Sequence, residues 1–490
     1  MVRGKKTAYL VLVLVNNIIF ILGLLLNELN ILYVSCIIEV IINLVVAYSE
    51  WKRNIVFIFF NLCIFLFCLS KPFAAFILGQ NYWATSNKES FIFAFTLIYV
   101  SMLAFSFAIC FYNRKILAKK VSYKNYVMQK VSYIIFILST IALLYEIVGM
   151  LYFFRNHSYL DFYNGIYSRN YIPFIVKILI QFQVPSMCIC LSTKPDRKLG
   201  YFILFLYLAS NFSMLIIGKR AAFMLAFIFC IVYCILRDNE QNNQSLDPLK
   251  FKSKSWLSKR KIKLLVIITP IAILGLTLMN EFRNGIYSST MINKKLRHPV
   301  SYFFYEQGST LDLLTTYNSI KDTIPDKFYF FGSFYDTFFY NAFISKLLGI
   351  QVYTGTTKEY LASTHTIAAQ LSYSIHGSNY FLGNSVDSSY LIDMFADFGW
   401  IGVFLISILL ALFMLKVPEL LNKSWLTRTI ILYCILGIFF LPRAMFMSQF
   451  SFVVSPYFWI AIIVCYLPIN IISRKRVCCP CRYEYPRKKS

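Results

Sequence analysis

Residues 396–416 read ADFGWIGVFLISILLALFMLK, an apolar stretch with one carboxylate near its start and a lysine at its end. A helix of roughly 20 apolar residues crosses the hydrocarbon core of a bilayer, which is about 30 Å thick. The stretch therefore predicts a membrane-spanning helix. The whole chain is 58% hydrophobic and 18% aromatic. This composition indicates that many more of its segments do the same.

Twelve such stretches follow one another, and they predict an all-α polytopic membrane protein with about 12 transmembrane helices. The predicted spans are 8–26, 31–48, 55–70, 91–112, 131–152, 173–192, 199–217, 221–236, 264–280, 396–416, 429–447 and 452–472. The short span 221–236 decides the register, because without it every later loop would change sides. The chain then divides into residues 1–280 with helices 1 to 9, a large loop at 281–395, residues 396–472 with helices 10 to 12, and a basic tail at 473–490.

Lysine and arginine gather in every second connection between the spans. Because these residues are retained on the cytoplasmic side, the pattern predicts that both termini and Arg237–Lys263 are cytoplasmic and that 281–395 lies outside. The net charge of +26 would suggest a nucleic-acid partner in a soluble protein. Here the basic residues flank spans on one side, where they meet anionic lipid. We therefore expect membrane lipid, and no nucleic acid, as a partner.

The first span and the cysteines fit a multi-pass protein. The first apolar run has full length and no small-residue cleavage site after it, so we expect an uncleaved first helix. Of thirteen cysteines, three lie in the tail, at Cys478, Cys479 and Cys481, and the others lie in predicted spans. None lies in an outer loop, which argues against a disulfide framework. A closed zinc site takes four ligands and no histidine is near the tail, so we expect no metal.

The large loop 281–395 is too long and too varied in sequence to be a simple linker. Its positive and negative charges are balanced. Ser309–Ile320 and Thr364–Ser374 suggest short helices within it. The segment Phe328–Phe343 is crowded with aromatic residues. It is interpreted as a belt at the lipid headgroups or, alternatively, as a platform on which sugar rings stack.

Four cations are expected at the outer membrane edge: Lys219, Arg220, Arg283 and Arg443. Charge at this depth is costly, so it usually faces a cavity or a partner. The planar fork of arginine binds phosphate oxygens in pairs and stays protonated. Several converging cations would suit a lipid pyrophosphate. The alternatives are snorkelling to the headgroups and pairing with Glu281 or Asp397.

The segment Tyr390–Gly402 reads YLIDMFADFGWIG. It resembles the Tyr…(Asp/Asn/Glu)-x-Gly-x-x-Gly signature of Wzy-type polymerases, with Tyr390, Gly399 and Gly402 at the motif positions. Shorter resemblances to the same family lie elsewhere, in the small-residue run Gly383–Ser389, the Gly-x-Arg turn at Ile217–Arg220 and the late Pro-Arg at Leu441–Arg443. The resemblance covers the whole topology, including the single large outer loop late in the chain.

The resemblance implies a metal-independent glycosyltransferase with a GT-C-like fold. Such an enzyme would polymerise oligosaccharide repeat units carried on undecaprenyl diphosphate, as in O-antigen of lipopolysaccharide or in capsule. It would act on the outer face of the bacterial cytoplasmic membrane, beside flippase and chain-length regulator proteins. Its leaving group is a lipid pyrophosphate, which preplaced cations stabilise. The acceptor hydroxyl benefits from a general base, and the candidates are Asp387, Asp393, Asp397 and His376.

Other functions compete with this interpretation. The chain has no nucleotide-binding loop of the P-loop type, so we expect no cofactor and a pre-activated substrate. O-antigen ligases share the layout, but their usual His-Asn falls here at Ser388 and Ser389. A flippase or other transporter of lipid-linked oligosaccharide would also have twelve spans. Transporters usually have two similar halves, whereas only the second half of this chain carries a large loop. A membrane-bound acyltransferase would require a catalytic arrangement around a histidine, which the sequence does not show.

Overall fold

The computed structural model describes residues 3–112, 125–155, 157, 172–216, 220–242, 255–258, 260–261, 263, 297–353 and 355–478. Within these residues all the regular elements are helices. Nine of the helical segments in this part of the chain are long and apolar enough to cross a membrane. The expected all-α polytopic membrane protein is thus confirmed. The predicted span 264–280 lies outside the described residues.

Four of the nine apolar segments come first in the chain. They are α1 (Arg3–Leu25), α2 (Leu29–Tyr48), the continuous run of α3 (Ile55–Ile64), the π-helical turn η1 (Phe65–Leu69) and α4 (Ser70–Ile77), and α5 (Lys88–Phe111). The next four are α6 (Tyr126–Phe154), the pair α8 (Phe174–Gln181) and α9 (Gln183–Ser192), α10 (Arg197–Ile216) and α11 (Arg220–Asn242). The segment α11 confirms the predicted span 221–236, on which the register of the later loops depends.

The ninth apolar segment is α20 (Tyr390–Leu420), and two shorter apolar helices follow it, α21 (Trp425–Ile438) and the first part of α22 (Pro456–Cys478). The predicted eleventh span reached residue 447, but the helix ends earlier. Three 3₁₀ turns replace its last part, η6 (Leu441–Arg443), η7 (Met447–Gln449) and η8 (Ser451–Val454). Proline lacks an amide hydrogen for helix bonds. Pro442 and Pro456 therefore favour a break on both sides of this stretch.

Side-chain caps fix where several helices begin. The side-chain oxygen Oδ1 of Asn125 accepts a hydrogen bond from the N–H of Met128 (3.2 Å), and Ser424 Oγ accepts from the N–H of Thr427 (3.0 Å). The first turn of a helix leaves its amide groups without partners, and such side chains satisfy them. The caps therefore start α6 and α21 at residues the hydrophobic pattern alone does not identify.

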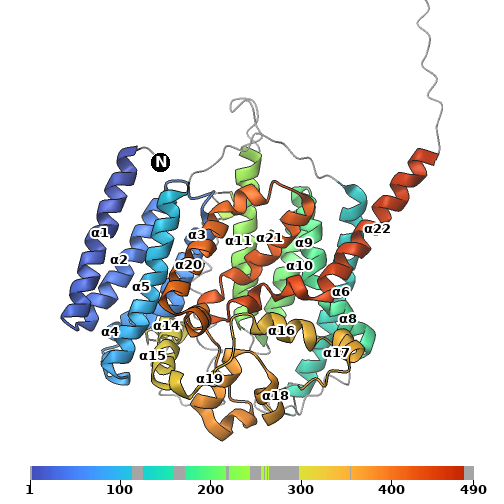
Figure 1. Ribbon diagram of the computed structural model, residues 1–490. Helices are drawn as coiled ribbons and strands as arrows, with labels where there is room; N and C mark the ends of the chain where they lie inside the picture. Colours follow the sequence, from blue (N-terminus) through green and yellow to red (C-terminus); the bar gives the residue numbers. More distant parts are fainter. Residues whose placement is uncertain are drawn as a thin grey trace, which may run out of the picture.

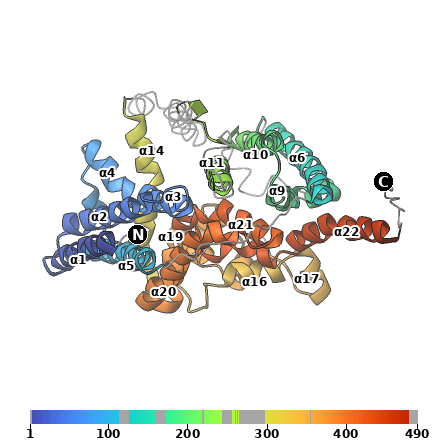
Figure 2. The same cartoon turned by 90° about the horizontal axis from the view of Figure 1, so that it is seen from above.

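The spans form two groups when the molecule is seen along them (Figure 2). One contains α1, α2, α3 and α5 with α20 beside them, and the other contains α6, α9, α10 and α11. Ser101 on α5 joins α20 by 2.8 Å hydrogen bonds to the hydroxyls of Tyr390 and Ser407. Because a polar group buried without a partner is costly, this triad fixes how α20 sits on α5.

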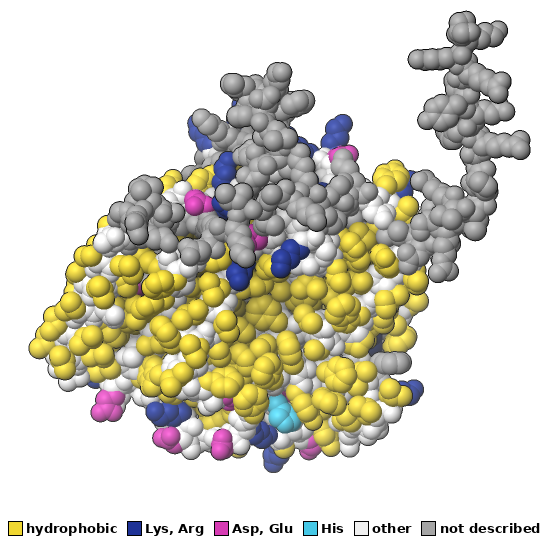
Figure 3. Space-filling view, turned by 45° about the horizontal axis from the view of Figure 1, so that its top comes forward, with side chains coloured by type: hydrophobic (Ala, Val, Ile, Leu, Met, Phe, Trp, Pro, Cys, Tyr) yellow, Lys and Arg dark blue, Asp and Glu magenta, His cyan; other side chains and the backbone are white. Residues whose placement is uncertain are grey.

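The surface of the spans is apolar. Hydrophobic side chains form a broad band in Figure 3, and charged side chains lie above and below it. On α20 the residues Ile401, Leu405 and Leu409 are 74%, 53% and 64% exposed. Their four-residue spacing places them on one helix face. Such an exposed apolar face is stable in lipid and not in water.

The residues between the two span-rich regions fold into a compact helical layer, which we call the cap (residues 299–389). Its elements are α14 (Pro299–Gln307), α15 (Thr310–Ile320), η4 (Lys321–Thr323), α16 (Gly332–Phe339), α17 (Ala342–Leu348), α18 (Lys358–Ser363), α19 (Ile367–His376) and η5 (Gly377–Leu382). Here α15 and α19 confirm the two short helices predicted from sequence. The cap lies at the end of the spans opposite the start of α1 and the end of α22 (Figure 1).

Candidate active site

The helix α20 is broken where it leaves the cap. Gly399 has φ 58° and ψ −156°, a conformation outside the helical region. Only glycine adopts it without a large steric cost, because it has no Cβ. The break separates a short N-terminal part, which carries Asp393 and Asp397, from the long apolar part. The motif glycine thus sets the direction of both carboxylates. Gly402 follows on the apolar part, close against Phe398.

Asp393 is almost fully buried, at 1% exposed. Its carboxylate accepts hydrogen bonds from the hydroxyl of Ser388 (3.0 Å) and from the N–H of Phe446 (2.7 Å). Two donors satisfy much of the hydrogen-bonding capacity of a buried carboxylate. Asp393 therefore ties the start of α20 to the turn after α21. In this arrangement it has little room to reach a substrate.

Asp397 holds the aromatic segment of the cap. Its two oxygens accept from the N–H of Tyr329 (3.1 and 3.0 Å), and one also accepts from the N–H of Phe330 (2.6 Å). The ring of Phe330 stacks on that of Phe446, with 5.1 Å between centroids. The sequence offers Asp397 as a partner for Arg443. It bonds to backbone amides instead, because the cap folds over the mouth of α20 and leaves these N–H groups without other acceptors.

Arg443 pairs with Asp387 across the mouth of α20. The Nε of Arg443 lies 3.3 Å from Oδ2 of Asp387, and the two side chains are 31% and 54% exposed. Arg443 lies in η6, after the end of α21, so the turn and not a helix presents its guanidinium. Water reaches both charges, and an exposed pair of this kind is weak. The guanidinium can exchange its carboxylate for another anion at small cost.

Arg220 forms a second ion pair on the cap side. At the first residue of α11, its Nη1 lies 3.5 Å from Oε2 of Glu306 on α14. The elements η6 and α14 both pack against the π-helical turn η1. The two ion pairs thus each include a residue from an element that contacts the same turn. π-Helical turns are rare and often occur at functional sites. Lys219 and Arg283, the other two cations of the predicted cluster, lie outside the described residues.

A third cation, Lys71, was not singled out from sequence. Its ammonium pairs with Asp312 on α15 and lies over the ring of Tyr305, 4.7 Å from the centroid. The hydroxyl of Tyr82 donates to the same carboxylate at 2.5 Å. Lys71 lies in α4, just past residue 70 where the predicted third span ended, and a lone lysine at the end of a span ordinarily signals snorkelling. Only the folded cap shows that it meets a carboxylate.

The predicted base His376 ends α19 in the cap. Among the described residues the structure gives it no polar contact with Asp387, Asp393 or Asp397. His365, which sequence reasoning did not select, lies 4.0 Å from Asp336 through its Nδ1. The histidine that the structure pairs with an acid is thus His365 and not a residue of the predicted site.

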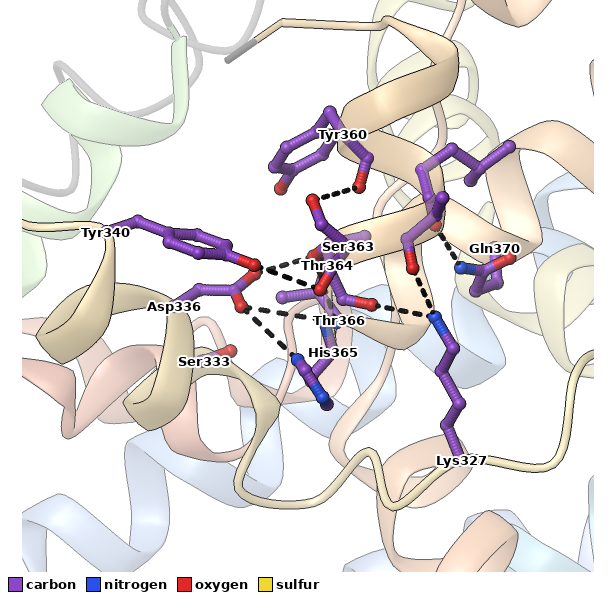
Figure 4. A network of polar contacts seen from close by, with 12 residues as sticks. Lys327, Ser333, Asp336, Tyr340, Tyr360, Ser363, Thr364, His365, Thr366 and Gln370 are labelled. Atoms are coloured by element: carbon purple, nitrogen blue, oxygen red, sulfur yellow. Dashed lines mark hydrogen bonds and ion pairs between the residues drawn. The ribbon is translucent and has the colours of Figure 1, made fainter. Parts of the chain in front are cut away.

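Asp336 on α16 is the centre of a polar network in the cap (Figure 4). It accepts from the hydroxyl of Thr364 (2.6 Å) and from the N–H of His365 (3.5 Å). Burial raises the pKa of the Asp336 carboxyl, and the hydrogen bond from Thr364 offsets part of that rise. A Cβ at Gly332 would lie 1.7 Å from the carbonyl oxygen of His365. The segment 361–366 is therefore fixed tightly onto α16.

A cavity of about 350 Å³ lies beside the second group of spans. Its walls come from α8, α9, α10, α11, α21 and α22, from the 3₁₀ turns η7 and η8, and from Thr337 of the cap. The lining joins neutral polar groups, such as Gln181 and Gln449, to aromatic rings, such as Tyr433 and Phe452. Hydroxyl and amide groups next to aromatic faces suit a neutral, polyhydroxylated ligand better than an ion. Gln449 lies in the turns that follow Arg443, so the cavity and the Arg443 pair share one segment.

Comparison with known proteins gives the chain a family. No curated protein and no solved structure matches it. A model of the family described as O-antigen polysaccharide polymerase Wzy matches residues 8–476, which includes the spans and the cap. This match extends over far more than half of the chain and agrees with the resemblance around Tyr390–Gly402. The chain belongs to the O-antigen polysaccharide polymerase Wzy family.

Proposed function

We propose that this protein polymerises oligosaccharide repeat units carried on undecaprenyl diphosphate, on the outer face of the bacterial cytoplasmic membrane. The family match over residues 8–476 carries this proposal. The ion pairs between the spans and the cap support it, because a lipid pyrophosphate must stay at membrane level while its glycan extends away. O-antigen and capsule are both products of this chemistry.

We propose that Arg443 and Arg220 hold the pyrophosphate, with Lys219 and Arg283 as further contributors. Both described arginines already face a carboxylate. Arg443 lies 3.3 Å from Asp387, and Arg220 lies 3.5 Å from Glu306. An incoming pyrophosphate carries more charge than a carboxylate and accepts both arms of a guanidinium. It would displace the carboxylate and remain bound as negative charge grows on the leaving oxygen.

We propose Asp387 as the base of first choice among Asp387, Asp393, Asp397 and His376. Asp393 is buried between two donors, and Asp397 is occupied by backbone amides. Asp387 is 54% exposed and would lose its cation when Arg443 turns to the pyrophosphate. The acceptor hydroxyl oxygen then bonds to the anomeric carbon, the bond to the pyrophosphate oxygen breaks, and the hydroxyl proton passes to the carboxylate. Undecaprenyl diphosphate leaves.

The test uses purified protein in detergent with synthetic undecaprenyl-diphosphate repeat units. A ladder of polymer should form without nucleotide and in the presence of a metal chelator, because the activated bond is already in the donor. A ligase-like enzyme would instead transfer glycan to a different acceptor. A flippase would make no ladder, and its loss in cells would strand repeat units on the inner leaflet. No ladder from correctly inserted protein with the matching substrate would overturn the proposal.

We propose that the cap lies outside and that both termini lie in the cytoplasm. The dense lysine and arginine segments of the sequence support this orientation. Cysteines introduced at exposed cap positions, such as Lys346 and Lys358, should react with an impermeant reagent in intact cells that lack an outer barrier. Labelling only after the membrane is permeabilised would invert the orientation and with it the site of polymerisation.

A further inference from the structure

A second cavity, of about 660 Å³, opens in the cap. It lies among η4, α18, α19 and η5. Of these, α18 and α19 occupy the end of the cap farthest from the spans (Figure 1). It is larger than the cavity beside the spans. A volume of this size takes a ligand of several rings rather than a small ion.

The charged groups of this cavity are of one sign. Lys327 and Lys358 line it, and none of its described lining residues is an aspartate or a glutamate. Asp326 and Glu359 adjoin the two lysines in the chain and are exposed, but they are not among the lining residues. An anion inside the cavity would therefore meet two ammonium groups at short range and the carboxylates only from outside.

Lys327 is held in position by backbone carbonyl groups, and the carboxylate of Asp336 is close enough to interact with it electrostatically. Its ammonium donates to the carbonyl oxygens of Ala362 (2.8 Å) and Thr364 (3.4 Å), as Figure 4 shows. An ammonium has three donors, so one stays available for a ligand. Carbonyl groups fix the side chain but bring no net negative charge. The network that holds Asp336 against segment 361–366 thus also holds a cation at the cavity wall.

The remaining lining suits a sugar. Tyr373 and Phe381 present two rings with centroids 5.6 Å apart, and Tyr373 is 41% exposed. Gln370 donates to the carbonyl of Leu361 (2.8 Å), which leaves its own oxygen as an acceptor. Aromatic faces receive the apolar faces of sugar rings, and convergent polar groups orient the hydroxyls.

We propose that this cavity binds an acidic saccharide, a stretch of the repeat unit whose sugars carry carboxylate groups. The inference rests on the proposed function, which makes a lipid-linked glycan the substrate, and it adds that this glycan is anionic. The pyrophosphate is the other anion of such a substrate. It stays at membrane level because its lipid is in the bilayer, whereas this cavity lies at the far end of the cap. The cations here therefore face the glycan itself.

The test measures binding to the full-length protein in detergent by calorimetry, with no turnover required. The probes are a trisaccharide of galacturonic acid and its neutral methyl ester. Wild-type protein should bind the acid about tenfold more tightly than the ester, the size expected for one charge-assisted contact. Lys358→Gln should remove that preference. Lys346→Gln is the matched control, since it removes an equal charge from an exposed position of the cap outside the cavity.

Tyr373→Ala should weaken the acid and the ester alike, because stacking does not depend on charge. Equal binding of acid and ester by the wild type, no binding of the acid, or an equal loss with Lys346→Gln would overturn the inference. A ladder formed from repeat units while the acid fails to bind would leave the polymerase function standing and reject only the acidic ligand. Conversely, binding of the acid without a ladder would reject the polymerase and retain the site.

Discussion

The two ends of α11 show the same kind of interaction in two different settings. At the cap end, Arg220 pairs with Glu306, and the side chains are 20% and 15% exposed. At the other end, Glu240 is 6% exposed and meets three cations, Arg237, Arg428 and Lys194. Arg428 comes from α21 and Lys194 from the turn between α9 and α10. The cap end thus has a partly exposed ion pair, and the other end has a more deeply buried charge cluster.

This difference in burial distinguishes ion pairs that are suited to bind a ligand from ion pairs that stabilise the fold. A buried charge cluster cannot give up a member cheaply, because any charge left behind is buried. It is suited to lock α9, α11 and α21 together. Asp238 strengthens that end by accepting from the N–H of Trp256 (2.6 Å) and the hydroxyl of Ser255 (2.6 Å). The exposed pair of Arg443 and Asp387 on the cap side contributes little to stability, and for that reason Arg443 is suited to bind a ligand.

The largest effect is expected from Glu240→Gln. The substitution leaves Arg237 and Arg428 buried without a carboxylate, and breaking a buried pair in this way costs roughly 3–5 kcal/mol. We expect a large loss of stability in unfolding measured in detergent. Asp387→Asn is the comparison on the cap side of the molecule, where the exposed pair of Asp387 and Arg443 is worth about 0–1 kcal/mol. Equal losses of stability in both variants would contradict the distinction between the buried cluster and the exposed pair.

The reverse pattern is expected for activity. Arg443→Ala should lower the rate of polymer formation by about 10²–10³-fold, the usual effect of removing one preplaced donor from a developing anion. Arg443→Lys should restore little, since an ammonium lacks the planar fork. Arg53→Ala is the control, because Arg53 pairs with Glu50 at the same 3.3 Å distance and is 38% exposed. A similar rate loss in the control would remove Arg443 from the site.

The smallest effect is a pH dependence at the buried cluster. Burial, and next the charge of Arg237, lower the pKa of Lys194 to about 8, and this outweighs the attraction of Glu240. Its pKa in an unfolded chain is higher, so between about pH 8 and 10 the unfolded state binds more protons. The stability of the wild type should therefore rise relative to Lys194→Met as pH increases through this window. A constant difference between their melting temperatures would show that Lys194 does not titrate there.

Much of the fold could be predicted because the bilayer imposes a simple rule on composition. Long apolar runs identified α1, α2, α5 and the other spans, and the weak span 221–236 proved to be α11. The ends of the helices were harder to predict from the sequence. The early end of α21 depends on prolines and on packing against the cap, and its cap residue Ser424 carries no hydrophobic signal.

The site could be predicted only as a set of residue types. Sequence reasoning placed Arg220, Arg443 and the carboxylates on one side of the membrane, and the structure brings Arg443 to Asp387. Which carboxylate pairs with Arg443 depends on the fold of the cap, because the cap places the amides of Tyr329 and Phe330 within hydrogen-bonding distance of Asp397. The pairing of Lys71 with Asp312 and of His365 with Asp336 could not be predicted, because the partners are distant from each other in sequence.

Gly332 has a consequence for the comparison of related chains. Its α-carbon leaves no space for a methyl group, since a Cβ would lie 1.7 Å from the carbonyl oxygen of His365. That carbonyl belongs to the segment that borders the larger cavity through Leu361 and Ala362. A relative with alanine or any larger residue at this position must hold the segment farther from α16. The residue at this one position therefore indicates which relatives can hold the segment as close to α16 as this chain does.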